Sequence, residues 1–244
     1  MYIERAPIIS AAVGENLKIL KGGLVGLDID AVTQATIYKA LDYASLKLNR
    51  TIVMDELTDY WKLASMAIKN GMSEEEAYSF AKIAFNRNEV YQFSPRVPGI
   101  ASLLKIFRDL EIPHVSISSR PSEFLDITKK WFFENFPWID PKNIIMDRPR
   151  GMPGGDYKAS VIEKEGVLLH IDDALEEVEI IVDKTRACIL MPSLPWNIHK
   201  EVNHPRIKKV GNVSISNSPN VWPVISFLAS SEAKQFLNLS VAQY

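Results

Sequence analysis

The chain contains 244 residues, of which 47% are hydrophobic and 24% are charged. These proportions are those of an ordinary globular protein and exclude a disordered or collagen-like chain. Lys and Arg number 28 and Asp and Glu number 30, which gives a net charge of −2. This balance gives no strong nucleic-acid signal and excludes a general attraction to anionic membranes, although it is compatible with a local basic patch. At this length, one large domain or one core with a sizeable insertion is favoured.

The cysteine content and the hydrophobic runs indicate the cellular compartment in which the protein is expected. Cys188 is the single cysteine, so no intramolecular disulfide can form and no second cysteine is available for a zinc cluster. We therefore expect a reducing compartment, the cytoplasm. Charged residues interrupt every apolar stretch before the roughly 20 residues that a membrane helix needs. Residues 6–14 are apolar, but acidic residues flank them, which makes a cleaved signal peptide a poor fit.

The first predicted strand lies within residues 22–30, an apolar run that ends in two aspartates. From residue 34 to about residue 88 the pattern is helical, in three successive segments. The third segment begins with Ser73 and Glu76, which have the spacing of a capping box. We therefore expect a block of helices inserted after the first strand.

Beyond residue 95 a proline-containing linker leads to an amphipathic helix over about 100–110, and strands and helices then alternate with short links. The predicted order is strand 113–118, helix 122–135, strand 143–147, helix 157–165, strand 167–172, helix 175–183 and strand 187–191. Such alternation predicts an α/β fold with a doubly wound parallel sheet. An amphipathic stretch at 221–229 is expected to cover the sheet or a partner subunit.

Polar residues stand at the carboxyl ends of three predicted strands, where the functional groups of such sheets gather. They are Asp28 and Asp30, Ser118 and Ser119, and Asp172 and Asp173. Four carboxylates in one crevice repel one another and require a cation, and an all-oxygen set favours Mg²⁺ over zinc. Lys158 can balance the charge of a bound phosphate. Each residue taken singly also fits a structural role, as a turn former, a helix cap or a solvated lysine.

The order of these motifs resembles that of the haloacid dehalogenase-like (HAD) hydrolase superfamily. The motifs are Asp28-Ile-Asp30, Ser118, Lys158 and the HIDD sequence that ends at Asp173, and the resemblance spans about residues 24–197. It implies an α/β core with an inserted helical cap.

Within that superfamily, the chain resembles most the 5′-nucleotidase, deoxy, cytosolic type C family. The features that carry this narrower resemblance are the SSRP and HIDD sequences, the spacing of 14 positions from Lys158 to Asp172, and LPWN at 194–197. Ala31 departs from the pattern, since Gly is usual there, and the N-terminal lead of about 20 residues is not part of it.

The resemblance implies a Mg²⁺-dependent phosphomonoesterase that acts through an aspartyl-phosphate. Asp28 would be the nucleophile, and Asp30 the general acid and then the base, with its backbone carbonyl on the metal. Asp28, Asp30 and Asp173 would hold Mg²⁺, with Asp172 beside them. The sequence leaves open whether Asp172 or Asp173 touches the ion.

Phosphate binding and substrate choice follow from the same resemblance. Ser118, backbone N–H groups near Ser119, and Lys158 would bind the phosphate. Residues 1–33 and 95–244 would form the core, and residues 34–94 a cap that excludes water and selects the leaving group.

The substrate is expected to be a small phosphorylated molecule, with a nucleotide as the leading hypothesis. Tyr60 and Trp61 are candidates to stack on a nucleobase, and equally to pack the cap's own core. Arg148 and Arg150 form either a basic rim or a solvated loop. The alternatives are a sugar phosphate, a phosphorylated nucleic-acid end, or a catalytically silent regulatory module.

Overall fold

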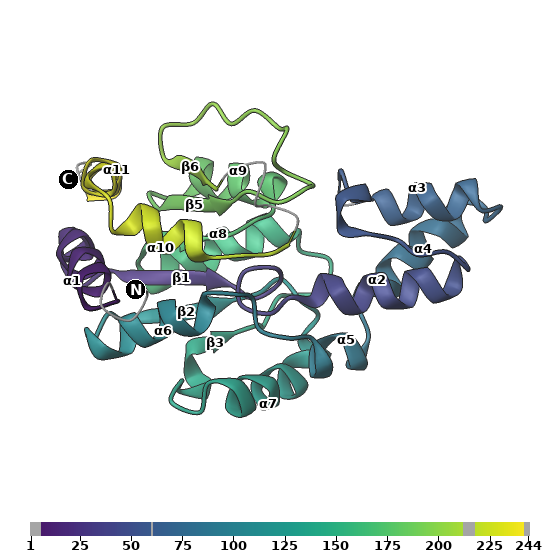
Figure 1. Cartoon of the computed structure of the whole chain (residues 1–244), viewed down its shortest axis with the longest axis horizontal. Coiled ribbons are helices and arrows are strands. Elements are labelled where there is room, and N and C mark those ends of the chain that lie inside the picture. Colours follow the sequence, from purple (N-terminus) through teal and green to yellow (C-terminus); the bar gives the residue numbers. More distant parts are fainter. Residues whose placement is uncertain (1–5, 60, 212–217, 242–244) are drawn as a thin grey trace.

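The computed structural model describes residues 6–59, 61–211 and 218–241. Within these ranges, one parallel sheet has the strand order β3-β2-β1-β4-β5-β6 (Figure 1). The strands are β1 (Leu24–Asp28), β2 (His114–Ile117), β3 (Ile144–Ile145), β4 (Val167–Ile171), β5 (Cys188–Pro192) and β6 (Ile207–Val210). The predicted α/β fold with a parallel sheet is confirmed.

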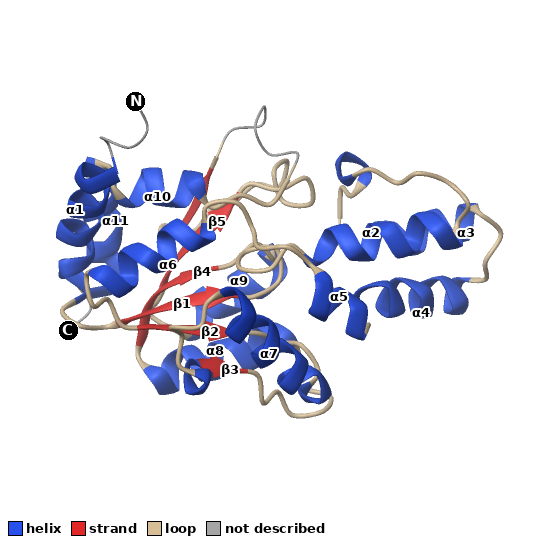
Figure 2. Ribbon diagram, turned by 60° about the horizontal axis from the view of Figure 1, so that its bottom comes forward, coloured by secondary structure: helices blue, strands red, loops and turns tan. Residues whose placement is uncertain are grey.

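Helices cover both faces of the sheet, as Figure 2 shows. One face packs against α8 (Gly154–Glu165) and α9 (Leu175–Lys184). The apolar cluster of the other face contains residues of α1 (Ala6–Leu17), α6 (Ile100–Asp109), α7 (Leu125–Asn135), α10 (Trp222–Leu228) and α11 (Ser231–Val241). No helix in the described part of the chain combines the length and the apolar character that a membrane crossing requires.

The N-terminal lead, whose purpose the sequence did not indicate, packs as α1 against the C-terminal helices. The Asn16 side chain donates to the carbonyls of Leu228 and Ser230, both at 2.8 Å. Buried Val224 and Ile225 of α10 belong to the cluster over the sheet, so the amphipathic stretch covers the sheet of its own chain. In Figure 1, α1 and α11 lie at the end of the molecule opposite α3 and α4.

Residues 36–93 form a separate group of helices with its own apolar cluster, here called the helical insertion. It comprises α2 (Thr36–Lys47), α3 (Lys62–Lys69), α4 (Glu74–Phe85) and α5 (Asn88–Phe93). The cluster is built from α2, α3, α4 and the segment between α2 and α3. The predicted capping box is present at α4: Ser73 N–H donates to Glu76 Oε2 at 2.9 Å, and Glu76 N–H to Ser73 Oγ at 3.4 Å. The insertion lies beyond the carboxyl end of β1 (Figure 1).

The edge strands differ most from the sequence-based expectation. β3 has two residues where five were predicted, and β6 was not predicted at all. In β6, Ile207 and Val210 are buried while Lys208 and Lys209 between them are partly exposed, so the strand lacks both a continuous apolar run and a strict alternation. Such a segment becomes a strand because β5 offers it hydrogen-bonding partners.

Candidate active site

The polar residues predicted from the sequence meet at the carboxyl ends of the three central strands. Asp28 is the last residue of β1, Ser118 follows β2, and Asp172 and Asp173 follow β4. Because β1 pairs with β2 on one side and with β4 on the other, these residues converge. The order of the strands reverses at β1, and such switch points are where α/β sheets bind their ligands.

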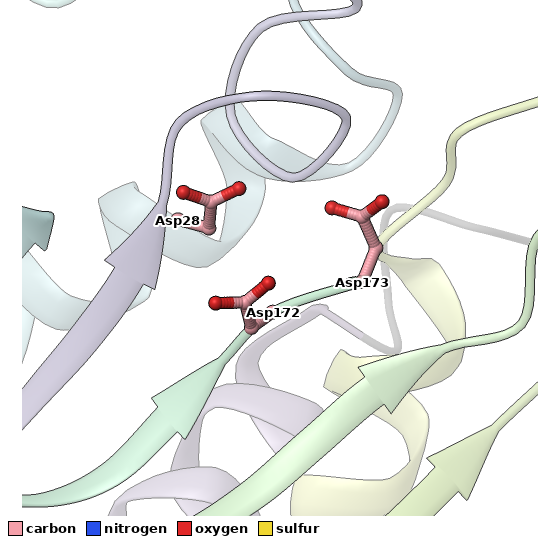
Figure 3. A group of neighbouring side chains, drawn as sticks. All are labelled: Asp28, Asp172 and Asp173. Atoms are coloured by element: carbon pink, nitrogen blue, oxygen red, sulfur yellow. The ribbon is translucent and has the colours of Figure 1, made fainter. Parts of the chain in front are cut away.

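Three carboxylates form a buried group at this point, here called the carboxylate cluster. Asp28, Asp172 and Asp173 each offer an oxygen, and these oxygens lie within 4.8 Å of one another (Figure 3). All three residues are buried. A set of carboxylate oxygens at the ends of adjacent strands fits a hard divalent cation such as Mg²⁺.

Burial and mutual repulsion make two of these carboxyls hard to ionise. Burial is the main reason that the pKa of Asp28 is well above its ordinary value, with Asp172 adding to the shift and Lys158 opposing it. Burial and the charge of Asp172 raise the pKa of Asp173 to about 8. The cluster therefore favours bound protons or a bound cation over three bare carboxylates.

Lys158 supplies a positive charge in the cluster from the second turn of α8. Its Nζ lies 3.0 Å from Asp28 Oδ1, 2.7 Å from Asp172 Oδ2 and 2.7 Å from Glu177 Oε2. Burial alone would lower the pKa of Lys158, but these three carboxylates outweigh it and raise that pKa well above its ordinary value. Lys158 is thus held charged, and Glu177 on α9 is a partner that the sequence did not predict.

The two adjacent aspartates after β4 have different surroundings. Asp172 Oδ2 accepts from Lys158 and lies 3.1 Å from His170 Nε2, while its Oδ1 accepts from the Ala174 N–H at 3.1 Å. Burial would raise the pKa of Asp172, but the charge of Lys158 and the hydrogen bonds of His170 and Lys158 outweigh it and lower that pKa. Asp173 Oδ2 accepts from the Trp196 indole N–H at 2.8 Å. Protein donors thus engage both oxygens of Asp172.

Asp30 lies beside the cluster and forms an ion pair with Arg120. Arg120 Nε donates to Asp30 Oδ2 at 2.8 Å and its Nη2 to Oδ1 at 2.9 Å, while the Thr36 hydroxyl donates to Oδ1 at 2.7 Å. Burial opposes ionisation of Asp30, but the charge and hydrogen bonds of Arg120 outweigh it and lower the pKa. In this geometry Asp30 is an ionised carboxylate.

Arg120 also joins the core to the two segments that lead into and out of the helical insertion. Its Nη2 donates to Gln34 Oε1 at 2.8 Å, and its Nη1 donates to Thr128 Oγ1 at 3.0 Å. The guanidinium lies over the Tyr91 ring of α5, 4.2 Å from the centroid. The Gln34 amide in turn donates to the carbonyl of Tyr91 at 2.7 Å. One buried arginine thereby holds Asp30 and both connecting segments.

The predicted phosphate-binding residues lie around the same crevice. Ser118 is buried, and its Oγ accepts from the Arg120 N–H at 3.2 Å. Ser119 Oγ donates to Glu177 Oε1 at 3.2 Å. Since the other oxygen of Glu177 pairs with Lys158, the Glu177 carboxylate is bound by two of the three residues that were predicted to hold phosphate.

The remaining candidate residues from the sequence do not join this crevice through contacts in the described part of the chain. Tyr60 lies outside the described residues. Trp61 is 39% exposed and contacts Tyr78 edge-on, with 5.2 Å between the ring centroids, inside the helical insertion. Arg148 donates to the carbonyl of Met152 in its own loop at 2.9 Å, and Arg150 is exposed.

Sequence reasoning missed four residues of the site: Arg120, Glu177, Trp196 and Asn197. Arg120 belongs to the SSRP sequence, and the last two belong to LPWN, so these motifs were noticed without a role being assigned to them. Glu177 was the hardest of the four to recognise from the sequence as a site residue, because an acidic residue in the first turn of a helix is commonly explained by the helix dipole.

Ala31 shows why glycine is usual at its position. Its φ of 58° lies in the left-handed region, which costs a residue with a Cβ roughly 1–2 kcal/mol relative to glycine.

Comparisons with known proteins yield structural neighbours. No family model matches the chain, and no curated protein matches it. Similar solved structures include a predicted phosphoglycolate phosphatase from Haemophilus somnus, with 13% identity, a TM-score of 0.47, and coverage of 72% of this chain and 88% of that one. A HAD hydrolase of family IA, variant 3, from Entamoeba histolytica has 16% identity, a TM-score of 0.48, and coverage of 72% and 85%.

A third neighbour is a conserved haloacid dehalogenase-like protein of unknown function from Agrobacterium tumefaciens, with 14% identity, a TM-score of 0.49, and coverage of 70% of this chain and 82% of that one. None of the three is described as a 5′-nucleotidase, so the narrower resemblance seen in the sequence receives no support from them. At these scores the chemistry of the site rests on its own geometry.

Proposed function

We propose that this protein is an enzyme, a Mg²⁺-dependent phosphomonoesterase of the HAD type. The observation that carries the proposal is the carboxylate cluster of Asp28, Asp172 and Asp173, buried around Lys158 at the carboxyl ends of β1 and β4. Its excess of negative charge calls for a cation, and its place at the switch point of the sheet suits a phosphate ligand.

Asp28, Asp173 and the backbone carbonyl of Asp30 are the groups that we assign to Mg²⁺. Asp173 is preferred over Asp172 because protein donors already engage both oxygens of Asp172. The bound ion would neutralise charge on the transferring phosphoryl group.

Asp28 then attacks phosphorus in line, so that a bond forms from its carboxylate oxygen to phosphorus and the bond to the leaving oxygen breaks. Ser118, Ser119 and Lys158 bind the phosphate oxygens. Asp30 must leave its ion pair with Arg120 and take up a proton before it can protonate the leaving oxygen. It then takes a proton from a water molecule whose oxygen attacks phosphorus, which breaks the bond to Asp28 and releases inorganic phosphate.

The helical insertion is assigned as a cap over residues 1–33 and 95–244, spanning residues 34–94. It would exclude water and select the leaving group. A small phosphomonoester is the inferred substrate. Nucleoside monophosphates are the hypothesis that the sequence favours, with sugar phosphates as the alternative. The single cysteine is a buried free thiol, which suits the reducing cytoplasm.

A screen of phosphomonoesters tests the function. Nucleoside monophosphates, sugar phosphates and a 5′-phosphorylated oligonucleotide are incubated with the protein and Mg²⁺, and released inorganic phosphate is measured, with EDTA as the control. We expect Mg²⁺-dependent release from one class. If no phosphomonoester is hydrolysed at high enzyme concentration, the chain is a silent HAD-like module and the proposal is wrong.

We expect Mg²⁺ to stabilise the protein more at about pH 8 than at about pH 5.5. The pKa of Asp173 is about 8 in the folded protein and about 4 when unfolded. In the metal-free protein, the contribution of protonated Asp173 to the free energy of unfolding is therefore lost as the pH rises from about 4 to about 8. At one Mg²⁺ concentration, equal to 100 times the Kd at pH 8, Mg²⁺ adds about 2.7 kcal/mol at that pH, or roughly 5–11 °C in Tm. The shift is smaller at pH 5.5, where a proton on Asp173 competes with the ion. Thermal unfolding with Mg²⁺ and with EDTA measures this. Equal shifts at both pH values, or an undiminished shift in Asp173→Asn, would contradict it.

Glu177→Gln is expected to tighten the binding of inorganic phosphate by about tenfold, or about 1.4 kcal/mol. The Glu177 carboxylate engages Ser119 and Lys158, so a phosphate dianion must displace it and suffers repulsion from it. Glu176→Gln is the matched control, because exposed Glu176 pairs with Lys200 instead. The inhibition constant of phosphate measures the effect, and equal constants for the two variants would argue against a shared subsite.

A further inference from the structure

The loop that follows β5 is fixed against Asp173 by its own side chains. Asn197 is buried, and its amide donates to the carbonyls of Asp173 and Pro192, both at 2.9 Å. Its Oδ1 accepts from the Leu194 N–H at 2.9 Å. One hydrogen bond therefore ties the loop to the main chain of Asp173, and two others fix Asn197 to Pro192 and Leu194, so that Trp196 occupies a defined position in the loop.

Trp196 binds the side chain of the same aspartate. Its indole N–H donates to Asp173 Oδ2 at 2.8 Å. Asn197 thus fixes the backbone of Asp173 while Trp196 fixes its carboxylate, which leaves Oδ1 for another partner. A donor placed in this way sets the orientation of a potential metal ligand, and neighbours of this kind control metal affinity.

The ring of Trp196 also reaches the helical insertion. It packs against the insertion's apolar cluster, which is built from buried side chains of α2, α3 and α4 such as Leu41, Met66 and Phe80. The same side chain thus contacts Asp173 in the core and the apolar interior of the insertion. A movement of the insertion that repacks this cluster moves the ring and its N–H.

We propose that Trp196 is a positioning residue that couples the placement of the helical insertion to the orientation of the Asp173 carboxylate. When the insertion is seated, the ring holds its N–H on Oδ2 and the carboxylate presents Oδ1 to the cluster. When the insertion is displaced, the hydrogen bond is strained and Asp173 loses its orientation. The proposal rests on the metal site of the proposed function, and it adds a link between that site and the insertion.

The test uses the whole protein and Mg²⁺ alone, so it needs no substrate. Mg²⁺ binding is measured by isothermal titration calorimetry, and hydrogen exchange is measured in α2, α3 and α4 with and without Mg²⁺. In the wild type we expect Mg²⁺ to slow exchange in these helices. Trp196→Phe keeps an aromatic ring and loses the N–H, so its Mg²⁺ affinity should fall by about tenfold and the protection should be lost.

Trp138→Phe is the matched control, because Trp138 packs against Phe136 and Arg108 outside the site. It should bind Mg²⁺ as the wild type does and keep the protection. Unchanged Mg²⁺ affinity in Trp196→Phe, or unchanged exchange of the wild-type helices when Mg²⁺ binds, overturns the coupling and leaves the phosphatase proposal standing. Failure of the wild type to bind Mg²⁺ overturns both, and the wild-type exchange result decides the question even where a variant does not fold.

Discussion

Replacement of Asp28 by Asn is expected to abolish Mg²⁺-dependent phosphate release, lowering kcat by about four orders of magnitude or more. The amide has nearly the same shape as the carboxylate, but it is a far weaker nucleophile and a weaker ligand for a hard cation. It also leaves Lys158 without one of its three carboxylate partners. The measurement is the rate of phosphate release on the substrate found by the screen.

The fold of Asp28→Asn should survive, and this separates a catalytic loss from unfolding. Burial raises the pKa of Asp28 well above its ordinary value, so the site disfavours the charge that the substitution removes. We expect the Tm in EDTA to stay close to that of the wild type. Asp42→Asn on the exposed face of α2 is the control and should keep full activity. Retention of Mg²⁺-dependent turnover by Asp28→Asn would remove Asp28 from the mechanism.

The sequence predicted those parts of the site that depend on position along a strand. Asp28, Ser118 and Asp172 each follow an apolar run, and the carboxyl ends of parallel strands meet at one edge. Lys158 was found from its place on a helix before β4. In each of these cases the local pattern determines which end of an element a residue occupies, and the fold determines the rest.

The contacts that set the state of each group could not be predicted in the same way. Asp30 and Arg120 are 90 residues apart, and Ser119 and Glu177 are 58 residues apart. Such pairings depend on which helix packs beside which strand, and no local periodicity records that. The consequence for Asp30 is chemical, because a residue expected to carry a proton is paired with a buried guanidinium.

Other elements could not be predicted from the sequence because their residues are only partly buried. β6 contains two lysines, and Lys209 places its Nζ on the carbonyls of Ile198 and Lys200, at 2.9 Å and 2.8 Å. In the sequence alone, the residues of β6 have the pattern of a polar loop, and only the neighbouring strand and loop make them a strand. The N-terminal helix α1 likewise acquires its role from packing against α10 and α11, and these lie at the other end of the chain.

Arg120→Met is expected to destabilise the protein by about 3 kcal/mol, the lower end of the range for breaking a buried ion pair. Asp30, Gln34 and Thr128 all lose a donor. The lower end applies because the Asp30 side chain is 39% exposed and water can solvate part of its charge. For a chain of this size the Tm should fall by roughly 6–12 °C, measured by thermal unfolding in EDTA.

Arg108→Met is the control for this substitution, since Arg108 forms an exposed pair with Asp109 and such pairs contribute about 0–1 kcal/mol. The double variant Arg120→Met with Asp30→Asn should recover part of the lost stability, because the unpaired carboxylate is then absent. If the Tm of Arg120→Met lies within about 2 °C of the wild-type Tm, water compensates for the lost donors. The hydrogen bonds of Arg120 to Asp30, Gln34 and Thr128 then contribute little to stability, which contradicts the prediction. Recovery in the double variant would show that the unpaired Asp30 carboxylate, more than the lost bonds to Gln34 and Thr128, accounts for the destabilisation.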